Sequence, residues 1–124
     1  MNIQQAQIKI KEFDKARGWS SNWNLKDLCL NITEEVGELW NLVKWVDEDK
    51  QKKIVIEHKV EVSDFIGDTL FLLLKIANQT GVDAAEGLQN TLDEYEKRMP
   101  AQTMKEVGHA NKLAGGVDNK SHGH

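Results

Sequence analysis

Apolar residues recur every three or four positions along most of the 124-residue chain, which is the spacing of one face of an α-helix. This spacing predicts a first helix from about Ile3 to Ala16, with Gly18 as its stop signal. A second helix is expected to begin at Asn24, a residue type that caps helix N-termini. It should continue to about Val46 along the most regular apolar stripe in the sequence.

Two more helices are expected in the second half of the chain. The third should begin after the charged stretch 47–53 and reach about Gln79. It is apolar all round between Leu70 and Leu74, which predicts a place at the centre of a bundle and in an oligomer interface. The fourth should follow Asp83 as its cap and stop at Pro100, the single proline. The chain is therefore predicted to be all-α, with a four-helix bundle-like fold.

The helical signal weakens after Pro100, and residues 115–124 have almost no apolar side chains. We expect one domain over residues 1–105, followed by a C-terminal extension over residues 106–124 that is flexible at its end. His122 and His124 could bind a stray metal ion, but a flexible tail is the simpler interpretation.

The amino-acid composition indicates which kinds of binding partner and which cellular compartment to expect. With 40% apolar and 29% charged residues, the chain has the make-up of an ordinary globular protein. Its formal charge of -4 argues against a nucleic acid polymer as partner, because such binding draws on clustered Lys and Arg. The single cysteine, Cys29, allows no internal disulfide, and neither a signal peptide nor a membrane span is expected. We therefore expect a cytoplasmic protein without a membrane partner.

Two acidic clusters lie within the predicted helices, beside their apolar stripes. The first consists of Glu34, Glu35 and Glu38, and the second includes Glu61 and Asp64. Carboxylates that meet across two helices repel each other unless protons or cations intervene. Mg²⁺ binds in proteins through carboxylates, waters and substrate phosphates, so a shared metal site would resolve the repulsion. Solvated acidic flanks on two ordinary amphipathic helices are the alternative.

A helical wheel refines the positions of the carboxylates. Glu35 and Glu38 fall together on the flank of the apolar stripe, and Glu34 turns further toward solvent. On the third helix one face collects four carboxylates, those of Glu57, Glu61, Asp64 and Asp68. A diiron bundle would need two Glu-x-x-His motifs, and the sequence offers a single match, Glu106-x-x-His109, in a weakly helical region.

With both clusters in place, the chain resembles the MazG-type nucleotide pyrophosphohydrolases of the all-α NTP pyrophosphatase superfamily. The family signature is EExxE followed by ExxD on the next helix, which the two acidic clusters match. The similarity covers about residues 8–100 and looks closest to the small branch of dCTP pyrophosphatases and compact single-domain MazG proteins. The runs RGWSSNW, EVGELWNLVKW, EVSDFIGDTLFLLLKIA and RMP carry that likeness.

The resemblance implies hydrolysis of a nucleoside triphosphate to the monophosphate and pyrophosphate. It implies Mg²⁺, with Mn²⁺ as a possible substitute, held by four residues: Glu35, Glu38, Glu61 and Asp64. Charge neutralisation by bound Mg²⁺ and an activated water suit this reaction. Glu34 or Glu35 is the candidate catalytic base for that water.

The resemblance also places a nucleobase pocket at Trp19, Trp23 and Trp45, three of the four tryptophans. Aromatic faces can stack a base, although core packing is the alternative for any single tryptophan. Relatives carry a Lys, an Asn and then Arg-x-Pro near the end of the fourth helix, but Thr91 and Tyr95 stand at the first two positions here. Phosphate contacts are therefore expected from Arg98, Lys97 or Lys75, unless the Lys-Arg pair simply serves the helix dipole.

The resemblance thus implies a cytoplasmic enzyme that removes unwanted deoxynucleotides from the nucleotide pool, and together with the apolar stretch near Leu70 it implies a homodimer or homotetramer. A catalytically silent nucleotide-binding or protein-interaction module is the alternative, and cleavage of dUDP to dUMP would indicate the related dimeric dUTPase and dUDPase chemistry. The sequence does not reveal the preferred base, because stacking accepts every base.

Overall fold

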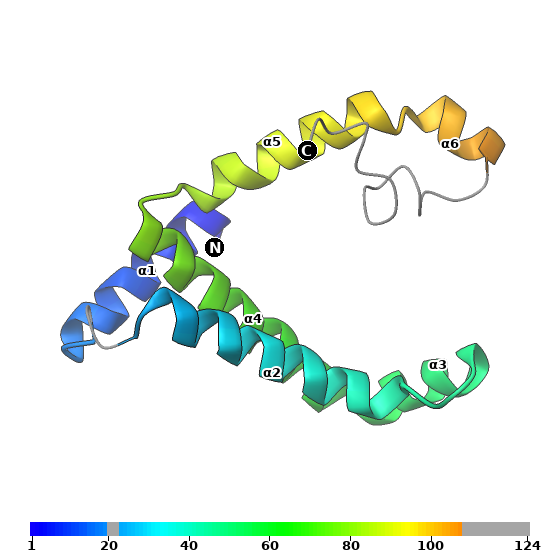
Figure 1. The fold of residues 1–124 in the computed structure, drawn as a ribbon, viewed down its shortest axis with the longest axis horizontal. Coiled ribbons are helices and arrows are strands. Elements are labelled where there is room, and N and C mark those ends of the chain that lie inside the picture. Colours follow the sequence, from blue (N-terminus) through cyan, green and yellow to red (C-terminus); the bar gives the residue numbers. More distant parts are fainter. Residues whose placement is uncertain (20–22, 108–124) are drawn as a thin grey trace. The chain divides into compact units, whose positions relative to one another are not determined.

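The structure, a computed structural model, describes residues 1–19 and 23–107 (Figure 1). These residues form six helices and no strand, which confirms the all-α prediction. The helices are α1 (Ile3–Ala16), α2 (Leu25–Val43), α3 (Glu48–Glu57), α4 (Lys59–Thr80), α5 (Ala84–Arg98) and α6 (Ala101–Val107). The expected C-terminal extension lies almost entirely outside the described residues.

The chain divides into two compact units, residues 1–84 and the residues from Ala85 onward. The first unit contains α1 to α4 and both acidic clusters. The second contains α6 and all of α5 except its first residue. Among the described residues, no helix is both long and apolar enough to span a membrane.

The predicted helix ends are confirmed where a cap or a left-handed glycine fixes them. The side chain of Asn24 accepts a hydrogen bond of 2.9 Å from the backbone N–H of Asp27, which starts α2. Gly18, at φ 69°, follows α1, and Gly81, at φ 71°, ends α4. Both glycines adopt the left-handed conformation that side chains with a Cβ rarely take.

The expected course of residues 44–58 was wrong. Instead of continuing to Val46, α2 ends at Val43, and the charged stretch forms a helix of its own, α3. Asp47 caps this helix by accepting a hydrogen bond of 2.9 Å from the N–H of Lys50. At its other end the backbone departs from helical geometry at His58, which separates α3 from α4. The apolar pattern alone did not reveal this local capping.

Helices α2 and α4 pack side by side and run antiparallel (Figure 1). Near the start of α2, the Gln79 side chain of α4 donates a hydrogen bond of 2.6 Å to the carbonyl oxygen of Trp23. Helix α1 also packs on the C-terminal part of α4, and just after that helix Gln7 Nε2 donates to the carbonyl oxygen of Val82 at 2.8 Å. This arrangement turns one face of α4 toward α2 and another toward α1.

The buried apolar core of the described residues is small and centred on α4. It consists of Leu28, Leu72, Leu74 and Ala77. Leu70 and Leu73, from the same apolar stretch, are 50% and 47% exposed. The stretch is therefore central to the packing, as predicted, and it also presents an exposed apolar face.

Candidate functional site

Carboxylates of α2 and α4 meet at a hollow of about 260 Å³, named here the acidic hollow. Its lining residues are Trp23, Asn31, Glu35, Asp68, Phe71 and Leu72. Because α2 and α4 run antiparallel, Glu35 in the middle of α2 lies level with the middle of α4. The structure thus brings the first predicted acidic cluster to the acidic face of the next long helix.

The pKa of Glu35 responds to carboxylates on both helices. The pKa of Glu35, which is half-buried, is raised above 4.5 first by desolvation and then by three neighbouring carboxylates. These are Glu38, Asp68 and Glu34, in order of decreasing effect. Charges from both helices therefore act on one carboxyl group.

Asp68 lines the acidic hollow with Glu35, although it does not belong to the predicted ligand set. The helical wheel placed it on the acidic face of α4, but the ExxD pattern ends at Asp64, one turn earlier. The spacing of four residues between the two aspartates was the available signal. What the sequence lacked was the register between α2 and α4, which sets Asp68 beside Glu35.

The other predicted ligands stand less close together. Glu61 is exposed, with Oε1 3.6 Å from Nδ1 of His58, and Asp64 is also exposed. Over residues 1–19 and 23–107 there is no group of three or more His, Cys, Asp or Glu side chains placed to hold a metal ion. The carboxylate oxygens of these residues suit a hard divalent cation, but they are not close enough together to form a complete coordination sphere. The ligand set Glu35, Glu38, Glu61 and Asp64 stays a prediction.

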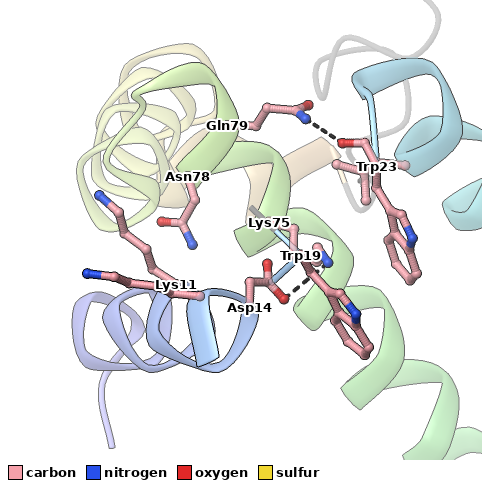
Figure 2. Close-up of a pocket in the computed structure, with 9 residues that line it drawn as sticks. Lys11, Asp14, Trp19, Trp23, Lys75, Asn78 and Gln79 are labelled. Atoms are coloured by element: carbon pink, nitrogen blue, oxygen red, sulfur yellow. Dashed lines mark hydrogen bonds and ion pairs between the residues drawn. The ribbon is translucent and has the colours of Figure 1, made fainter. Parts of the chain in front are cut away.

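A second cavity, of about 160 Å³ and named here the aromatic pocket, opens between α1, α4 and the residues before α2 (Figure 2). Its lining includes Lys11, Asp14, Trp19, Trp23, Lys75, Asn78 and Gln79. The rings of Trp19 and Trp23 are nearly parallel, at an angle of 12° and with centroids 6.2 Å apart. These tryptophans are 36% and 37% exposed, which favours pocket lining over core packing for both.

Lys75 lines the aromatic pocket and does not line the acidic hollow. Its ammonium group is 3.2 Å from Asp14 Oδ1 and 4.0 Å from the centroid of the Trp23 ring. Figure 2 shows Asp14 on α1 and Lys75 on α4 pointing toward one another. The sequence proposed Lys75 as a phosphate contact, and the structure surrounds it with a carboxylate and aromatic rings.

Trp45 is not where the sequence placed it. Because α2 ends at Val43, Trp45 lies in the following turn instead of on the helix flank shared with Glu38, and it is 87% exposed. Lys44 Nζ lies 5.8 Å from the centroid of its ring. A role for Trp45 in base stacking stays a prediction.

Lys97 and Arg98 lie in the last turn of α5, in the second unit. Arg98 Nη1 is 3.4 Å from Glu94 Oε1, and its guanidinium lies 4.8 Å from the centroid of the Tyr95 ring. Phosphate contacts by Arg98 and Lys97 stay predictions. His109 of the alternative diiron motif, His122 and His124 lie outside the described residues.

The segment that contains both acidic clusters matches a known protein family. Residues 24–103 match the model of the MazG nucleotide pyrophosphohydrolase domain. No curated protein and no solved structure matches the chain. The matched segment spans α2 to α5 and includes the Glu35 and Asp68 side of the acidic hollow. The chain therefore belongs to the MazG nucleotide pyrophosphohydrolase family.

Proposed function

We propose that this nucleotide pyrophosphohydrolase is a Mg²⁺-dependent enzyme that converts deoxynucleoside triphosphates to monophosphates and pyrophosphate, and so cleanses the nucleotide pool. The main support for the proposal is that Glu35 and Asp68, from α2 and α4, line one hollow and that carboxylates of both helices raise the pKa of Glu35. Trp23 lines both this acidic hollow and the aromatic pocket. A triphosphate could thus meet metal ligands while its base reaches aromatic rings.

In this proposal the metal is held by carboxylates that face the acidic hollow or lie within a turn of it. They are Glu35, Glu38, Asp64 and Asp68, with Glu61 as a further ligand from the family pattern. Mg²⁺, or Mn²⁺ in its place, supplies charge neutralisation of the triphosphate and activation of a water. The protein's own contribution is to fix these oxygen ligands on two packed helices.

The proposed catalytic base is Glu35, with Glu34 as the second candidate. A carboxylate that the metal leaves partly uncoordinated can take the proton from the attacking water, and Glu35 lines the acidic hollow. Once the base has taken a proton from the attacking water, the α-phosphorus can be attacked opposite the pyrophosphate leaving group. Glu34 is more exposed than Glu35, so its carboxylate is better solvated.

The direct test is to incubate the full chain with each deoxynucleoside triphosphate, with Mg²⁺ or with EDTA, and to measure pyrophosphate. The proposal expects release with Mg²⁺ and none with EDTA. A folded protein that binds nucleotide without turnover would instead establish the catalytically silent module, and no binding at all would favour an interaction bundle.

Metal binding should stabilise the protein in a pH-dependent way. The folded state raises the pKa of Glu35, so it holds that proton more tightly than the unfolded chain does. In metal-free protein this contribution to stability is present below pH 4.5 and is lost as the pH rises through the folded-state pKa. Mg²⁺ competes with that proton and relieves the repulsion, so it should raise the Tm clearly at pH 7.5 and much less at pH 4.5.

Thermal unfolding with and without Mg²⁺ at the two pH values measures this effect. At a Mg²⁺ concentration 100 times its Kd, the expected gain in the free energy of unfolding is about 2.7 kcal/mol. The Glu35→Gln variant should lose most of the pH dependence. An equal Tm increase at both pH values would contradict a metal site at Glu35.

We also propose a homodimer or homotetramer built on exposed apolar residues of α2 and α4. Trp40 is 57% exposed and Leu70 is 50% exposed, a poor arrangement for isolated helices in water. The expected mass in solution, measured by light scattering after gel filtration, is two or four times 14.1 kDa. Leu70→Asp should shift it toward the monomer, whereas Ile8→Asp, at an exposed position on α1, should not. A monomeric wild-type protein would refute the assembly.

A further inference from the structure

Asn31 is a polar residue within α2 that the stability of the helix does not explain. It is half-buried and lies seven residues after the Asn24 cap, where the helix is fully formed. Asparagine favours caps and turns, because its side chain competes for backbone hydrogen bonds, and it is a poorer helix former than alanine. Within residues 1–19 and 23–107, the Asn31 carboxamide has no hydrogen-bond partner. A side chain that weakens its helix without forming an internal bond points to a contact with a ligand.

Asn31 lies where the acidic hollow meets another hollow beside α2. This second hollow, named here the side hollow, has a volume of about 320 Å³ and is lined by Trp23, Asp27, Leu30 and Asn31. Trp23 and Asn31 line both hollows. The two hollows therefore adjoin at these side chains, and a ligand that leaves the acidic hollow on this side passes Asn31.

The spacing of Asn31 and Glu35 fits the step from a phosphate to a sugar. The two residues line the acidic hollow one helical turn apart, about 6 Å along the axis of α2. In a nucleotide, one oxygen and one carbon link the α-phosphorus to the sugar ring, so the contacts to phosphate and sugar must lie close together. With the α-phosphate held by metal at Glu35 and Asp68, the sugar comes within reach of Asn31.

The chemistry of the carboxamide suits a sugar hydroxyl. An asparagine side chain has two N–H donors and one carbonyl acceptor, and a hydroxyl group can pair with either. A deoxynucleoside triphosphate carries a single free hydroxyl on its sugar, the 3′-hydroxyl. This hydroxyl is therefore the group of the proposed substrate that Asn31 can recognise.

Asp27, the charged residue of the side hollow, is a poorer candidate for this contact. It lies two helical turns before Glu35, about 12 Å along the axis. Its place in the first turn of α2 is favourable for the helix dipole. The helix itself thus accounts for Asp27, whereas it does not account for Asn31.

We propose that Asn31 determines sugar specificity by forming a hydrogen bond with the 3′-hydroxyl of the bound nucleotide. This role rests on the proposed function for its substrate, and it adds a residue that the two acidic clusters do not include. The contact takes no part in the chemical step. It holds the sugar, and so places the α-phosphorus relative to the metal ligands.

The test compares each deoxynucleoside triphosphate with its 2′,3′-dideoxy analogue, which lacks the 3′-hydroxyl, in the wild-type protein and in Asn31→Ala. In wild type, kcat/KM for pyrophosphate release should be about 3- to 10-fold lower for the dideoxy analogue, as expected for one uncharged hydrogen bond. Asn31→Ala should lower kcat/KM for the deoxy substrate by the same factor and leave the value for the analogue unchanged. The preference for the deoxy substrate should therefore disappear.

The same comparison separates recognition from a structural effect. A structural role of Asn31 would lower kcat/KM for both substrates equally and keep their ratio, and that outcome would overturn the proposed contact. Equal cleavage of both substrates by wild type would overturn it too. Asn41→Ala, the same change at an exposed position of α2, is the matched control and should keep the wild-type ratio. Because alanine is the better helix former, Asn31→Ala should fold with an unchanged or higher Tm.

Binding of monophosphates distinguishes a failure of this contact from a failure of the proposed function. Trp23 lines both hollows, so tryptophan fluorescence can report the binding of a deoxynucleoside monophosphate and of its 2′,3′-dideoxy analogue, with Mg²⁺ and without turnover. Wild type should bind the deoxy form more tightly, and Asn31→Ala should bind both equally. If this result is obtained and no triphosphate is cleaved, the proposed function fails and the role of Asn31 stands. If triphosphates are cleaved while Asn31→Ala keeps the wild-type preference, the role of Asn31 fails and the proposed function stands.

Discussion

Glu38→Gln is expected to lower the rate of pyrophosphate release by about 100-fold or more while the helix content stays unchanged. Glu38 is exposed on α2, and its carboxylate makes the largest contribution of any neighbouring charge to the raised pKa of Glu35. Glutamine keeps the size of the side chain but removes the negative charge. A hard divalent cation binds a neutral amide oxygen more weakly than a carboxylate, so a loss of charge here should reduce metal occupancy.

The measurement is pyrophosphate release over a range of Mg²⁺ concentrations, with circular dichroism as the check on folding. Glu12→Gln, the same change at an exposed position on α1, is the matched control and should retain wild-type activity. Partial recovery of the Glu38→Gln variant at high Mg²⁺ would support metal binding as the cause. Full activity at low Mg²⁺ would exclude Glu38 from the site.

Asp68→Asn should cost at least as much activity as Asp64→Asn, again about 100-fold or more. Asp68 lines the acidic hollow together with Glu35 and acts on its pKa, whereas Asp64 stands one helical turn earlier on α4. The family pattern assigns the metal to Asp64, and the register of the two helices adds Asp68. Removing the Asp68 charge should also bring the pKa of Glu35 closer to its ordinary value.

Steady-state kinetics of both aspartate variants decide this point, with Asp49→Asn on α3 as the exposed control. The Mg²⁺ dependence of the Tm provides a second measurement that does not require turnover. Wild-type kinetics in Asp68→Asn, together with an inactive Asp64→Asn, would show that the family pattern was complete and that Asp68 is a bystander.

Local signals in the sequence predicted much of the fold. Asn24 and the two left-handed glycines determine helix ends through their own backbone and side chain, so these ends could be predicted from single residues. The break at His58 could not, because it depends on a new cap at Asp47 that competes with the continuing apolar pattern. The position of Trp45 was wrong for the same reason.

In the candidate site, residues that share one helix could be predicted from the sequence, whereas residues that only packing brings together could not. The sequence selected Glu35 and Glu38 because both lie on one flank of a helix, and the structure places Glu38 among the charges that act on Glu35. It stopped at Asp64 because the ExxD pattern ends there. The packing of α2 on α4, which brings Asp68 to the same hollow as Glu35, is not encoded in any local pattern. The pairing of Asp14 with Lys75 joins residues 61 positions apart and was not foreseen.

The central claim is best tested by identifying the products directly. The protein is incubated with Mg²⁺ and a deoxynucleoside triphosphate, and the reaction is followed by phosphorus NMR. We expect equal amounts of nucleoside monophosphate and pyrophosphate, with no nucleoside diphosphate at any time. Formation of nucleoside diphosphate and inorganic phosphate, or a complete lack of turnover in folded protein with Mg²⁺, would contradict the claim.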